Sequence, residues 1–404
     1  MVMQLKDLSM KGKRVLMRVD FNVPMTKQGA ISDDSRIRAA LPSIQEIIKA
    51  GGKVILMSHL GRPKGVTPSC TLKPCADRLS ELLGKPVRFV NDCIGDVVQK
   101  AVSEMKEGDV ILLENLRFYE AEEHPDKYPE FVKKLAMLGD VYVNDAFGTA
   151  HRAHASTALI AKYFPKKAAA GLLMIKEVEA LGASLLNPKR PFVAIIGGAK
   201  ISTKIGVLKS LVHKADFLLI GGAMTFTFMK AVGLSVGTSP VEETMIDEAI
   251  GVMQEAKDLG KKTYFPLDLV VASEFKDDAP SKVIDIQEGI PDGFQGMDIG
   301  PKTIELWKPV LEASHTIFWN GPVGVFEFPT FAKGTKALAQ IVANCKKAFT
   351  VVGGGDSIAA LEQSGLQGAV SHVSTGGGAS LEFIEQGTLP GIEALEEAAK
   401  AEVN

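Results

Sequence analysis

Short apolar runs alternate along the chain with longer amphipathic stretches. In the first half, three runs predict buried strands: RVLMRVDFNVP (14–24), KVILMSH (53–59) and DVILLENL (109–116). In the second half, four runs predict strands, and each ends in a turn that contains glycine: FVAIIGG (192–198), DFLLIGGA (216–223), HTIFWNGP (315–322) and AFTVVGGG (348–355).

Helix-like patterns lie between these runs, for example at Ser202–His213 and Glu242–Leu259. Alternating strands and helices are typical of parallel sheets with helices on both faces. In such sheets ligands bind at the carboxyl ends of the strands, where the glycines of the second half fall. The pattern therefore predicts an α/β fold with a ligand site at these turns.

The segment LLMIKEVEALGASLLN (172–187) has apolar residues at helical spacing and precedes Pro188 and Pro191. A helix that ends at a proline forms a stiff connector between domains. We therefore expect an N-terminal domain over 1–171, a connecting helix over 172–187 and a C-terminal domain over 188–387. The remaining residues, 388–404, have another short helical pattern.

Composition narrows the class of protein. The 404 residues carry a net charge of −2, so the chain has no polycationic character for nucleic acid. The longest charge-free apolar stretch, Phe217–Met229, is too short to span a bilayer, and Gly221-Gly222 interrupts it. No signal-peptide pattern is evident, so we expect a cytoplasmic protein with reduced cysteines.

The two halves differ in chemistry. All ten arginines lie in the first 190 residues, whereas 26 of the 39 glycines follow position 190. Arginine grips carboxylates and phosphates with two parallel hydrogen bonds, and glycine-rich loops let the backbone approach a nucleotide closely. The asymmetry suggests two kinds of anion site, with compositional drift as the alternative.

The usual nucleotide motifs are absent: no GxxxxGK[ST] occurs, and no complete GxGxxG follows a strand. The turn GGAKISTK (197–204) instead places two lysines four residues apart. If Lys200 and Lys204 open a helix, they lie on one face of its first turn, where positive charge opposes the helix dipole. A bound phosphate would remove this mismatch; solvated lysines remain the alternative.

Read together, the motifs of the chain closely resemble the phosphoglycerate kinase family. The matching segments run in order along nearly the whole sequence: RVDFNVP (18–24), DDSRIRAALPSI (33–44), SHLGRP (58–63), LLENLRF (112–118), NDAFGTAHRAHAST (144–157), GGAKISTKI (197–205), GGAMTFTF (221–228), GFQGMDIGP (293–301), WNGPVGVFEF (319–328), GGGDS (353–357) and STGGGASLE (374–382). Ser357 departs from the threonine of many members but keeps the hydroxyl.

The resemblance implies reversible phosphoryl transfer between ATP and the carboxylate of 3-phosphoglycerate, which in glycolysis runs from 1,3-bisphosphoglycerate to ADP. It implies two Rossmann-like lobes, each a parallel sheet flanked by helices, joined by a helix. The C-terminal segment 388–404 is expected to return to the N-terminal lobe. Members are typically monomers, and ATP or ADP is bound with Mg²⁺.

By the same resemblance, the N-terminal lobe binds the acceptor. Arg36 is expected to stabilise the transferring phosphoryl group. Asp20 and Asn22 are expected to bind the hydroxyl and carboxylate region of the acceptor. The residues expected to bind its phosphate are His59, Arg62, Arg117 and Arg152. The implied acceptor-binding residues are Asp20, Phe21, Asn22, Arg36, His59, Leu60, Gly61, Arg62, Arg117 and Arg152. His154 is expected to be a supporting histidine, and Arg38 a solvated or structural charge.

The C-terminal lobe is implied to bind the nucleotide, with Lys200 at the transferring phosphoryl group and Asp356 as the carboxylate for Mg²⁺. The implied nucleotide-binding residues are Gly197, Gly198, Lys204, Gly221, Gly222, Gly296, Asn320, Glu327, Gly354, Gly355, Asp356 and Ser357. Gly376, Gly377 and Gly378 are expected to supply amides to the phosphoryl group during transfer.

This chemistry needs no catalytic base, because the attacking carboxylate is already ionised at neutral pH. Alignment and charge neutralisation suffice, and lobe closure is expected to bring the substrates together and exclude water. Two alternatives remain at this point. One is another acyl-phosphate kinase or a nicotinamide dehydrogenase, although the latter lacks its GxGxxG. The other is a nucleotide-binding protein without turnover, although Arg36, Lys200 and Asp356 are all present.

Overall fold

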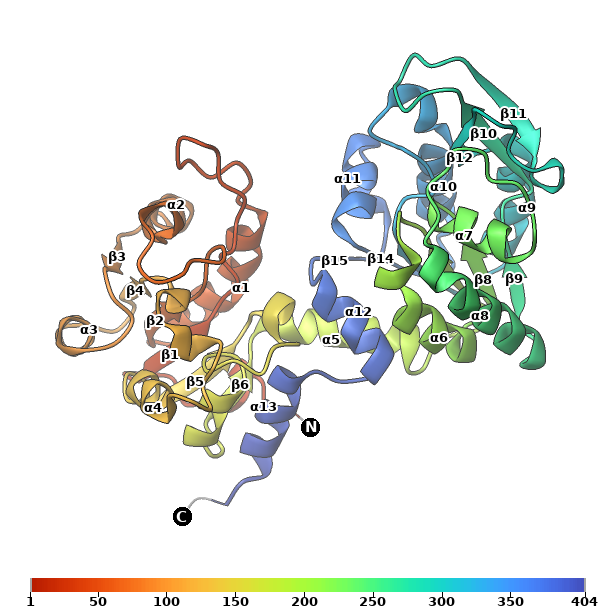
Figure 1. Ribbon diagram of the computed structural model, residues 1–404. Helices are drawn as coiled ribbons and strands as arrows, with labels where there is room; N and C mark the ends of the chain where they lie inside the picture. The colour runs from red at the N-terminus through yellow and green to blue at the C-terminus, as the bar shows by residue number, and fades with distance from the viewer. Residues whose placement is uncertain (1, 403–404) are drawn as a thin grey trace. The chain divides into compact units, whose positions relative to one another are not determined.

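The computed structural model describes residues 2–402 and divides the chain into two compact units. Unit 1 comprises Met1–Val178 and Thr388–Asn404, and unit 2 comprises Glu179–Gly387. Helix α5, Leu172–Leu185, contains the point at which the chain passes from unit 1 to unit 2. Figure 1 labels the elements of both units.

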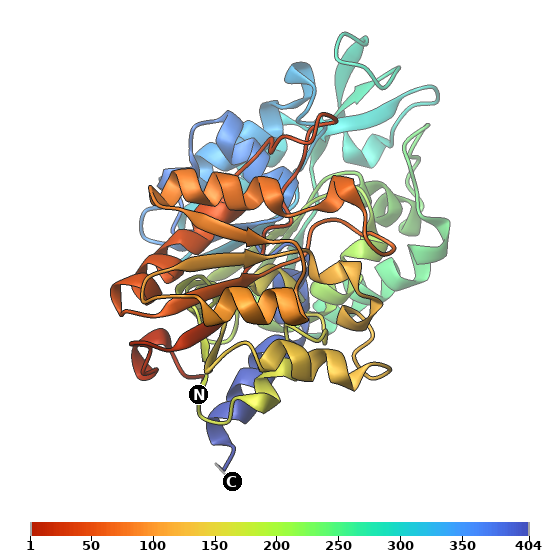
Figure 2. The same cartoon turned by 90° about the vertical axis from the view of Figure 1, so that its left-hand side faces the viewer.

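The sheet of unit 1 is parallel throughout, with the strand order β3-β4-β2-β1-β5-β6. Its strands are β1 (Arg14–Arg18), β2 (Lys53–Met57), β3 (Val87–Val90), β4 (Val110–Leu113), β5 (Val141–Asn144) and β6 (Ala168–Ala170). Helices of this unit lie on both faces of the sheet (Figure 2). They are α1 (Ser35–Lys49), α2 (Lys73–Leu83), α3 (Asp96–Ser103), α4 (Pro129–Ala136) and α13 (Pro390–Lys400).

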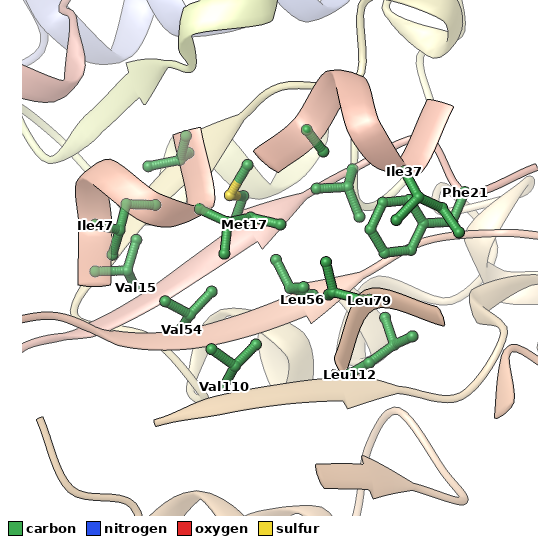
Figure 3. Close-up of a cluster of buried hydrophobic side chains, with 14 of the residues drawn as sticks. Val15, Met17, Phe21, Ile37, Ile47, Val54, Leu56, Leu79, Val110 and Leu112 are labelled. Atoms are coloured by element: carbon green, nitrogen blue, oxygen red, sulfur yellow. The ribbon is translucent and has the colours of Figure 1, made fainter. Parts of the chain in front are cut away.

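The core of unit 1 follows from the alternation of side chains along each strand. Val15 and Met17 of β1 belong to a buried cluster with Ile37 of α1 and Leu79 of α2 (Figure 3). Leu16, which lies between them and is also fully buried, points to the opposite face. Because both faces are covered, the strand must be apolar at every central position, which explains the continuous run in the sequence.

The C-terminal helix α13 completes unit 1. Gly391 donates its N–H to the carbonyl of Ala150 at 2.8 Å, and the N–H of Lys166 donates to the carbonyl of Ala398 at 2.8 Å. A Cβ on Gly391 would lie 3.1 Å from the Cα of Ala150, so the absence of a side chain permits this close approach. Helix α13 is thereby fixed to the segments that follow β5 and precede β6.

Unit 2 is built on a second parallel sheet, with the order β15-β14-β13-β7-β8-β9. Its strands are β7 (Phe192–Ile196), β8 (Phe217–Ile220), β9 (Lys262–Tyr264), β13 (Thr316–Asn320), β14 (Phe349–Gly353) and β15 (His372–Ser374). Its helices are α6 (Ile205–Lys214), α7 (Met224–Ala231), α8 (Ile246–Asp258), α9 (Pro301–Glu312), α10 (Lys333–Asn344), α11 (Gly355–Gln363) and α12 (Gly378–Gln386).

A small antiparallel sheet with the order β11-β10-β12 is inserted in unit 2. It consists of β10 (Asp268–Ala272), β11 (Ser281–Asp285) and β12 (Gln295–Ile299). Sequence analysis did not predict it, because the apolar run of β10 is short and the strands β11 and β12 have no continuous apolar run.

The predicted fold class, two parallel α/β lobes flanked by helices, is confirmed. All seven predicted strands are present. The helix predicted from Ser202 begins only at Ile205, after the 3₁₀ turn Ile201–Thr203. Within residues 2–402, no helix combines the length and apolarity that crossing a membrane requires. The four cysteines are free thiols.

Candidate active site

Asp20 and Asn22 follow β1 directly and are held together with Arg36, the second residue of α1. Arg36 Nη1 lies 3.3 Å from Asp20 Oδ1 and donates to the carbonyl of Asn22 at 2.8 Å. The N–H of Asn22 also donates to Asp20 Oδ1 at 3.2 Å. The Arg36 side chain remains 38% exposed, so its guanidinium is fixed on one side and free to meet a ligand on the other.

The loop after β2 contributes His59, Leu60, Gly61 and Arg62, and side chains from other loops hold it. Asn22 Oδ1 accepts from the N–H of Gly61 at 2.9 Å, and Asn115 Nδ2 donates to the carbonyl of Leu60 at 2.7 Å. Gly61 has φ = +67°, a conformation that favours glycine. His59 and Leu60 are buried, whereas Arg62 is exposed next to the rigid turn.

Arg117 and Arg152 bring further positive charge to the same place. Arg117 lies in the 3₁₀ turn after β4, donates to the carbonyl of Gly61 at 3.0 Å and lies 3.5 Å from Glu123 Oε1. Burial, together with the charges of Arg117, Arg18 and Arg152, lowers the pKa of His154 to about 3. Burial likewise lowers the pKa of His59, helped by several arginines. Both histidines are therefore neutral members of a cationic cluster.

Phe21 differs from the other residues implied to bind the acceptor. Its side chain is fully buried and belongs to the core cluster that contains Ile37 (Figure 3). Its N–H donates to Ser58 Oγ at 2.8 Å. The structure thus gives the phenyl ring a packing role, while the backbone around it shapes the loop that carries Asp20 and Asn22.

In unit 2 the candidate site lies at the carboxyl ends of neighbouring parallel strands, where glycines allow the backbone turns to touch. A Cβ on Gly197 would lie 2.2 Å from the carbonyl oxygen of Pro322, and one on Gly222 would lie 2.5 Å from the nitrogen of Gly198. Gly198 has φ = +114° and Gly222 has φ = +73°. Gly221 is confined by Val323, at 2.7 Å from its hypothetical Cβ. These turns can only be built from glycine.

The two lysines of GGAKISTK flank a 3₁₀ turn instead of opening one helix together. Lys204 immediately precedes α6, and its Nζ donates to Asn320 Oδ1 at the end of β13. Burial lowers the pKa of Lys204, while the charge of Asp356 raises it. Lys200 is exposed. The structure therefore brings Lys204, Asn320 and Asp356 together and leaves Lys200 exposed to solvent.

These turns border a cavity of about 330 Å³. Five of the residues predicted to bind the nucleotide line it: Gly198, Gly222, Gly296, Glu327 and Asp356. The remaining wall is largely apolar and includes residues that sequence analysis missed: Phe226, Leu269, Phe275, Met297, Val323 and Val325. Their apolar character alone did not distinguish them from core residues. Phe226 comes from α7, Leu269 and Met297 come from the antiparallel sheet, and the other three lie in loops.

Two helix N-termini supply further polar groups in unit 2. Gly354, with φ = +89°, precedes α11, whose first residues are Gly355, Asp356 and Ser357. Ser357 is fully buried and its Oγ accepts from the N–H of Gly321 at 2.6 Å, so this hydroxyl holds the turn after β13. Gly376 and Gly377 precede α12, which begins at Gly378. Exposed amides at such termini favour anions.

The arrangement also fits a magnesium ion that is coordinated by one protein carboxylate and otherwise by phosphate oxygens and water. Asp356 is an exposed carboxylate that lines the cavity beside the Lys204 side chain. Across the described residues, no group of three or more His, Cys, Asp or Glu side chains could hold a metal by itself. A single carboxylate is what Mg²⁺ needs when phosphate oxygens and water complete its octahedron.

Comparison with known proteins agrees with this geometry. The family model for phosphoglycerate kinase matches residues 5–387. The chain is 56% identical over 396 residues to the phosphoglycerate kinase of Dictyoglomus turgidum and 54% identical over 396 residues to a cytosolic phosphoglycerate kinase of Nicotiana tabacum, covering 98% of this chain and of each relative. The structure of the phosphoglycerate kinase from Coxiella burnetii matches with a TM-score of 0.90 at 41% identity, covering 99% of this chain and 100% of that one. The chain therefore belongs to the phosphoglycerate kinase family, phosphotransferases that use a carboxyl group as acceptor and catalyse the ATP-generating step of glycolysis.

Proposed function

We propose that unit 1 binds 3-phosphoglycerate through the cluster formed by Arg36, His59, Arg62, Arg117 and Arg152. The observation that carries this proposal is the convergence of four arginines and the His59 imidazole from different elements of unit 1. Hydrogen bonds with Asn22, Asn115 and Arg117 hold the loop after β2 in place. Planar guanidinium groups match phosphate oxygens, and the neutral imidazole of His59 adds a hydrogen bond. Asp20 and Asn22 meet the hydroxyl and carboxylate end of the acceptor.

Unit 2 is proposed to bind ATP or ADP in the cavity of about 330 Å³. The apolar wall that includes Phe226 and Met297 suits a purine base. Gly296 lets the Phe226 ring pack in this wall, because a Cβ on Gly296 would lie 2.3 Å from that ring. Glu327 accepts hydrogen bonds from the ribose. Lys204, Asn320 and the N-terminus of α11 meet the phosphates, because charge and exposed amides are concentrated there.

The proposed transfer needs no proton abstraction. The carboxylate of 3-phosphoglycerate and, in the reverse direction, the β-phosphate oxygen of ADP are already ionised near neutral pH. The protein must align donor and acceptor and neutralise the charge on the transferring phosphoryl group. We assign this to Arg36, Lys200 and the amides of Gly376, Gly377 and Gly378 at the N-terminus of α12.

We assign Mg²⁺ binding to Asp356. When bound with the nucleotide, the ion would neutralise phosphate charge and orient the phosphate chain. Asp356 begins α11 on the cavity wall, so the carboxylate would hold the ion at the phosphate end of the nucleotide.

A monomer in the cytoplasm is our proposal for the working state. The cytosolic tobacco relative, 54% identical over 396 residues, supports the compartment. Sedimentation would test the monomer, which predicts a single species near 43.2 kDa.

A coupled assay with ATP, Mg²⁺ and 3-phosphoglycerate tests the proposed site when it is applied to Arg152→Ala. Loss of one ionic hydrogen bond to phosphate should raise the KM for 3-phosphoglycerate about tenfold or more while leaving the KM for ATP unchanged. Arg88→Ala is the matched control, because Arg88 is exposed, lies on the edge strand β3 and pairs with Glu104 at the end of α3. A rise in both KM values, or in neither, would refute the assignment of Arg152.

A further inference from the structure

Arg18, the last residue of β1, is a buried cation that sequence analysis left without a role. Only 1% of its surface is exposed. Each of its three guanidinium nitrogens has a partner: Nε donates to Ser156 Oγ at 2.8 Å, Nη1 donates to the carbonyl of Val19, and Nη2 lies 3.0 Å from Nδ1 of His59. A buried guanidinium with a partner at each nitrogen is held in one orientation.

The contact with His59 fixes the proton of the imidazole. A guanidinium has only donors, so Nδ1 of His59 must be the acceptor. Burial, together with Arg18, Arg117, Arg36 and His154, keeps the pKa of His59 low, so the ring carries a single proton. That proton must therefore reside on Nε2, which makes the other edge of the ring a hydrogen-bond donor.

Glu122 is linked to Arg18 by hydrogen bonds through Ser156. The carboxylate is fully buried and accepts from both the N–H and the hydroxyl of Ser156, whose oxygen accepts from Arg18. Burial raises the pKa of Glu122 to about 7, although Arg18 and Ser156 favour the ionised form. Whatever the protonation of Glu122, Arg18 can only donate to His59, so the tautomer does not depend on it.

We propose that Arg18 is a positioning residue that holds His59 as the Nε2–H tautomer, so that His59 donates a hydrogen bond to the phosphate of the acceptor. This inference rests on the acceptor site proposed above. Without Arg18, a neutral imidazole could place its proton on Nδ1 and present a lone pair, which would repel a phosphate oxygen.

The test is a long-range ¹H–¹⁵N correlation spectrum of the full-length protein labelled at histidine, with His59 assigned through His59→Gln. At pH 7 the wild type should show a protonated Nε2 and an unprotonated Nδ1 for His59. Adding 3-phosphoglycerate should shift the Nε2–H signal. Arg18→Met should mix the tautomers and raise the KM for 3-phosphoglycerate at least about tenfold, leaving the KM for ATP unchanged.

Arg14→Met is the matched control. Arg14 lies on the same strand but pairs with Asp140 at 2.8 Å, and its side chain is 36% exposed. Its replacement should leave both the His59 spectrum and the KM for 3-phosphoglycerate unchanged. Should Arg18→Met fail to fold, Ser156→Ala removes one hydrogen bond from Arg18 and should give the same changes in smaller measure. Arg18→Lys keeps a donor and a charge. Its His59 tautomer and its KM for 3-phosphoglycerate should therefore lie closer to the wild type than those of Arg18→Met.

The outcomes separate this inference from the acceptor site. Protonated Nδ1 or a doubly protonated His59 in the wild type would overturn the positioning by Arg18, as would an unchanged tautomer in Arg18→Met. A purely structural Arg18 would lower stability without altering the tautomer. The expected tautomer with no response to 3-phosphoglycerate would instead overturn the acceptor site, and with it the donation to phosphate.

Discussion

The two units differ in which part of the protein is available to bind an anion. In unit 1 the charge comes from the side chains of Arg36, Arg117 and Arg152. Arg36 and Arg117 are held by hydrogen bonds to backbone carbonyls. In unit 2 the contact surface is largely backbone: turns at Gly198 and Gly222 and the N-terminus of α11.

The difference explains the asymmetry in composition. A site built from arginines needs supporting residues that stop long side chains from moving, such as Asn22 and Asn115. A site built from backbone needs the absence of side chains, and a single methyl group can destroy it. Unit 1 should therefore be sensitive to removal of charge, and unit 2 to addition of volume.

The largest effect is expected from adding one methyl group to the backbone-built site. Gly222→Ala would place a Cβ 2.5 Å from both N and O of Gly198, at φ = +73°. We expect a loss of stability of at least about 3 kcal/mol, together with loss of nucleotide binding. Trp307 and Trp319 are both buried in unit 2 and are the two tryptophans of the chain, so denaturation followed by tryptophan fluorescence reports on this unit.

Gly251→Ala is the control for this substitution. Gly251 lies within α8, and a Cβ there would have no neighbour within 4 Å. Because alanine favours the helix, stability should rise by up to about 1 kcal/mol. Similar stability in the two variants would contradict the steric argument for Gly222.

In unit 1 the strongest effect should follow from removing the exposed guanidinium of Arg36. Arg36→Ala is expected to lower kcat by about a hundredfold or more, since it deletes a donor to the transferring phosphoryl group. Arg38→Ala is the control, because Arg38 is 54% exposed and pairs with Asp34. Near-normal turnover of Arg36→Ala in the coupled assay would remove Arg36 from its proposed role.

Asp356→Ala tests whether the nucleotide binds to unit 2 and 3-phosphoglycerate to unit 1. Calorimetry should show the Kd for MgADP rising about tenfold or more, with binding of 3-phosphoglycerate unchanged. Glu362→Ala alters an exposed acid further along α11 and should change neither Kd. Equal weakening of both ligands by Asp356→Ala would argue against the division.

The smallest expected effect, taken per pH unit, is a pH dependence of the stability of unit 2. Burial raises the pKa of Asp298 from 3.8 to about 7. Between these values the folded state binds more protons than the unfolded state, so this group makes stability fall as pH rises from about 4 to about 7, by at most about 1.4 kcal/mol per pH unit. Above that range its contribution no longer changes.

Asp298→Asn should flatten this slope when unfolding is followed by tryptophan fluorescence at a series of pH values. The exposed Asp292→Asn serves as the control and should retain the slope of the wild type. An unchanged slope in Asp298→Asn would show that Asp298 is ionised in the folded state throughout the range.

Much of the fold was predictable because its signals are local. Continuous apolar runs such as 192–196 must be buried on both faces, and glycines at their ends mark the turns at which ligands bind. The motifs that carry the family resemblance are likewise contiguous, so they named the family and the reaction. The role of each residue stays a prediction until the variants above are measured.

Local signals were insufficient where a residue's function depends on distant partners. The apolar wall of the nucleotide cavity combines Phe226 of α7 with Met297 of β12, which are far apart in sequence and resemble ordinary core residues. Phe21 stands within a ligand-binding motif, yet its ring packs in the core.

By itself, the sequence determined two α/β lobes, an arginine-rich and a glycine-rich half, and the family to which the chain belongs. Tertiary structure alone decided that Arg18 meets His59, 41 residues away, and Ser156, 138 residues away. The physical reason is that the direction of a hydrogen bond, and hence the tautomer of an imidazole, depends on which groups the fold brings within about 3 Å.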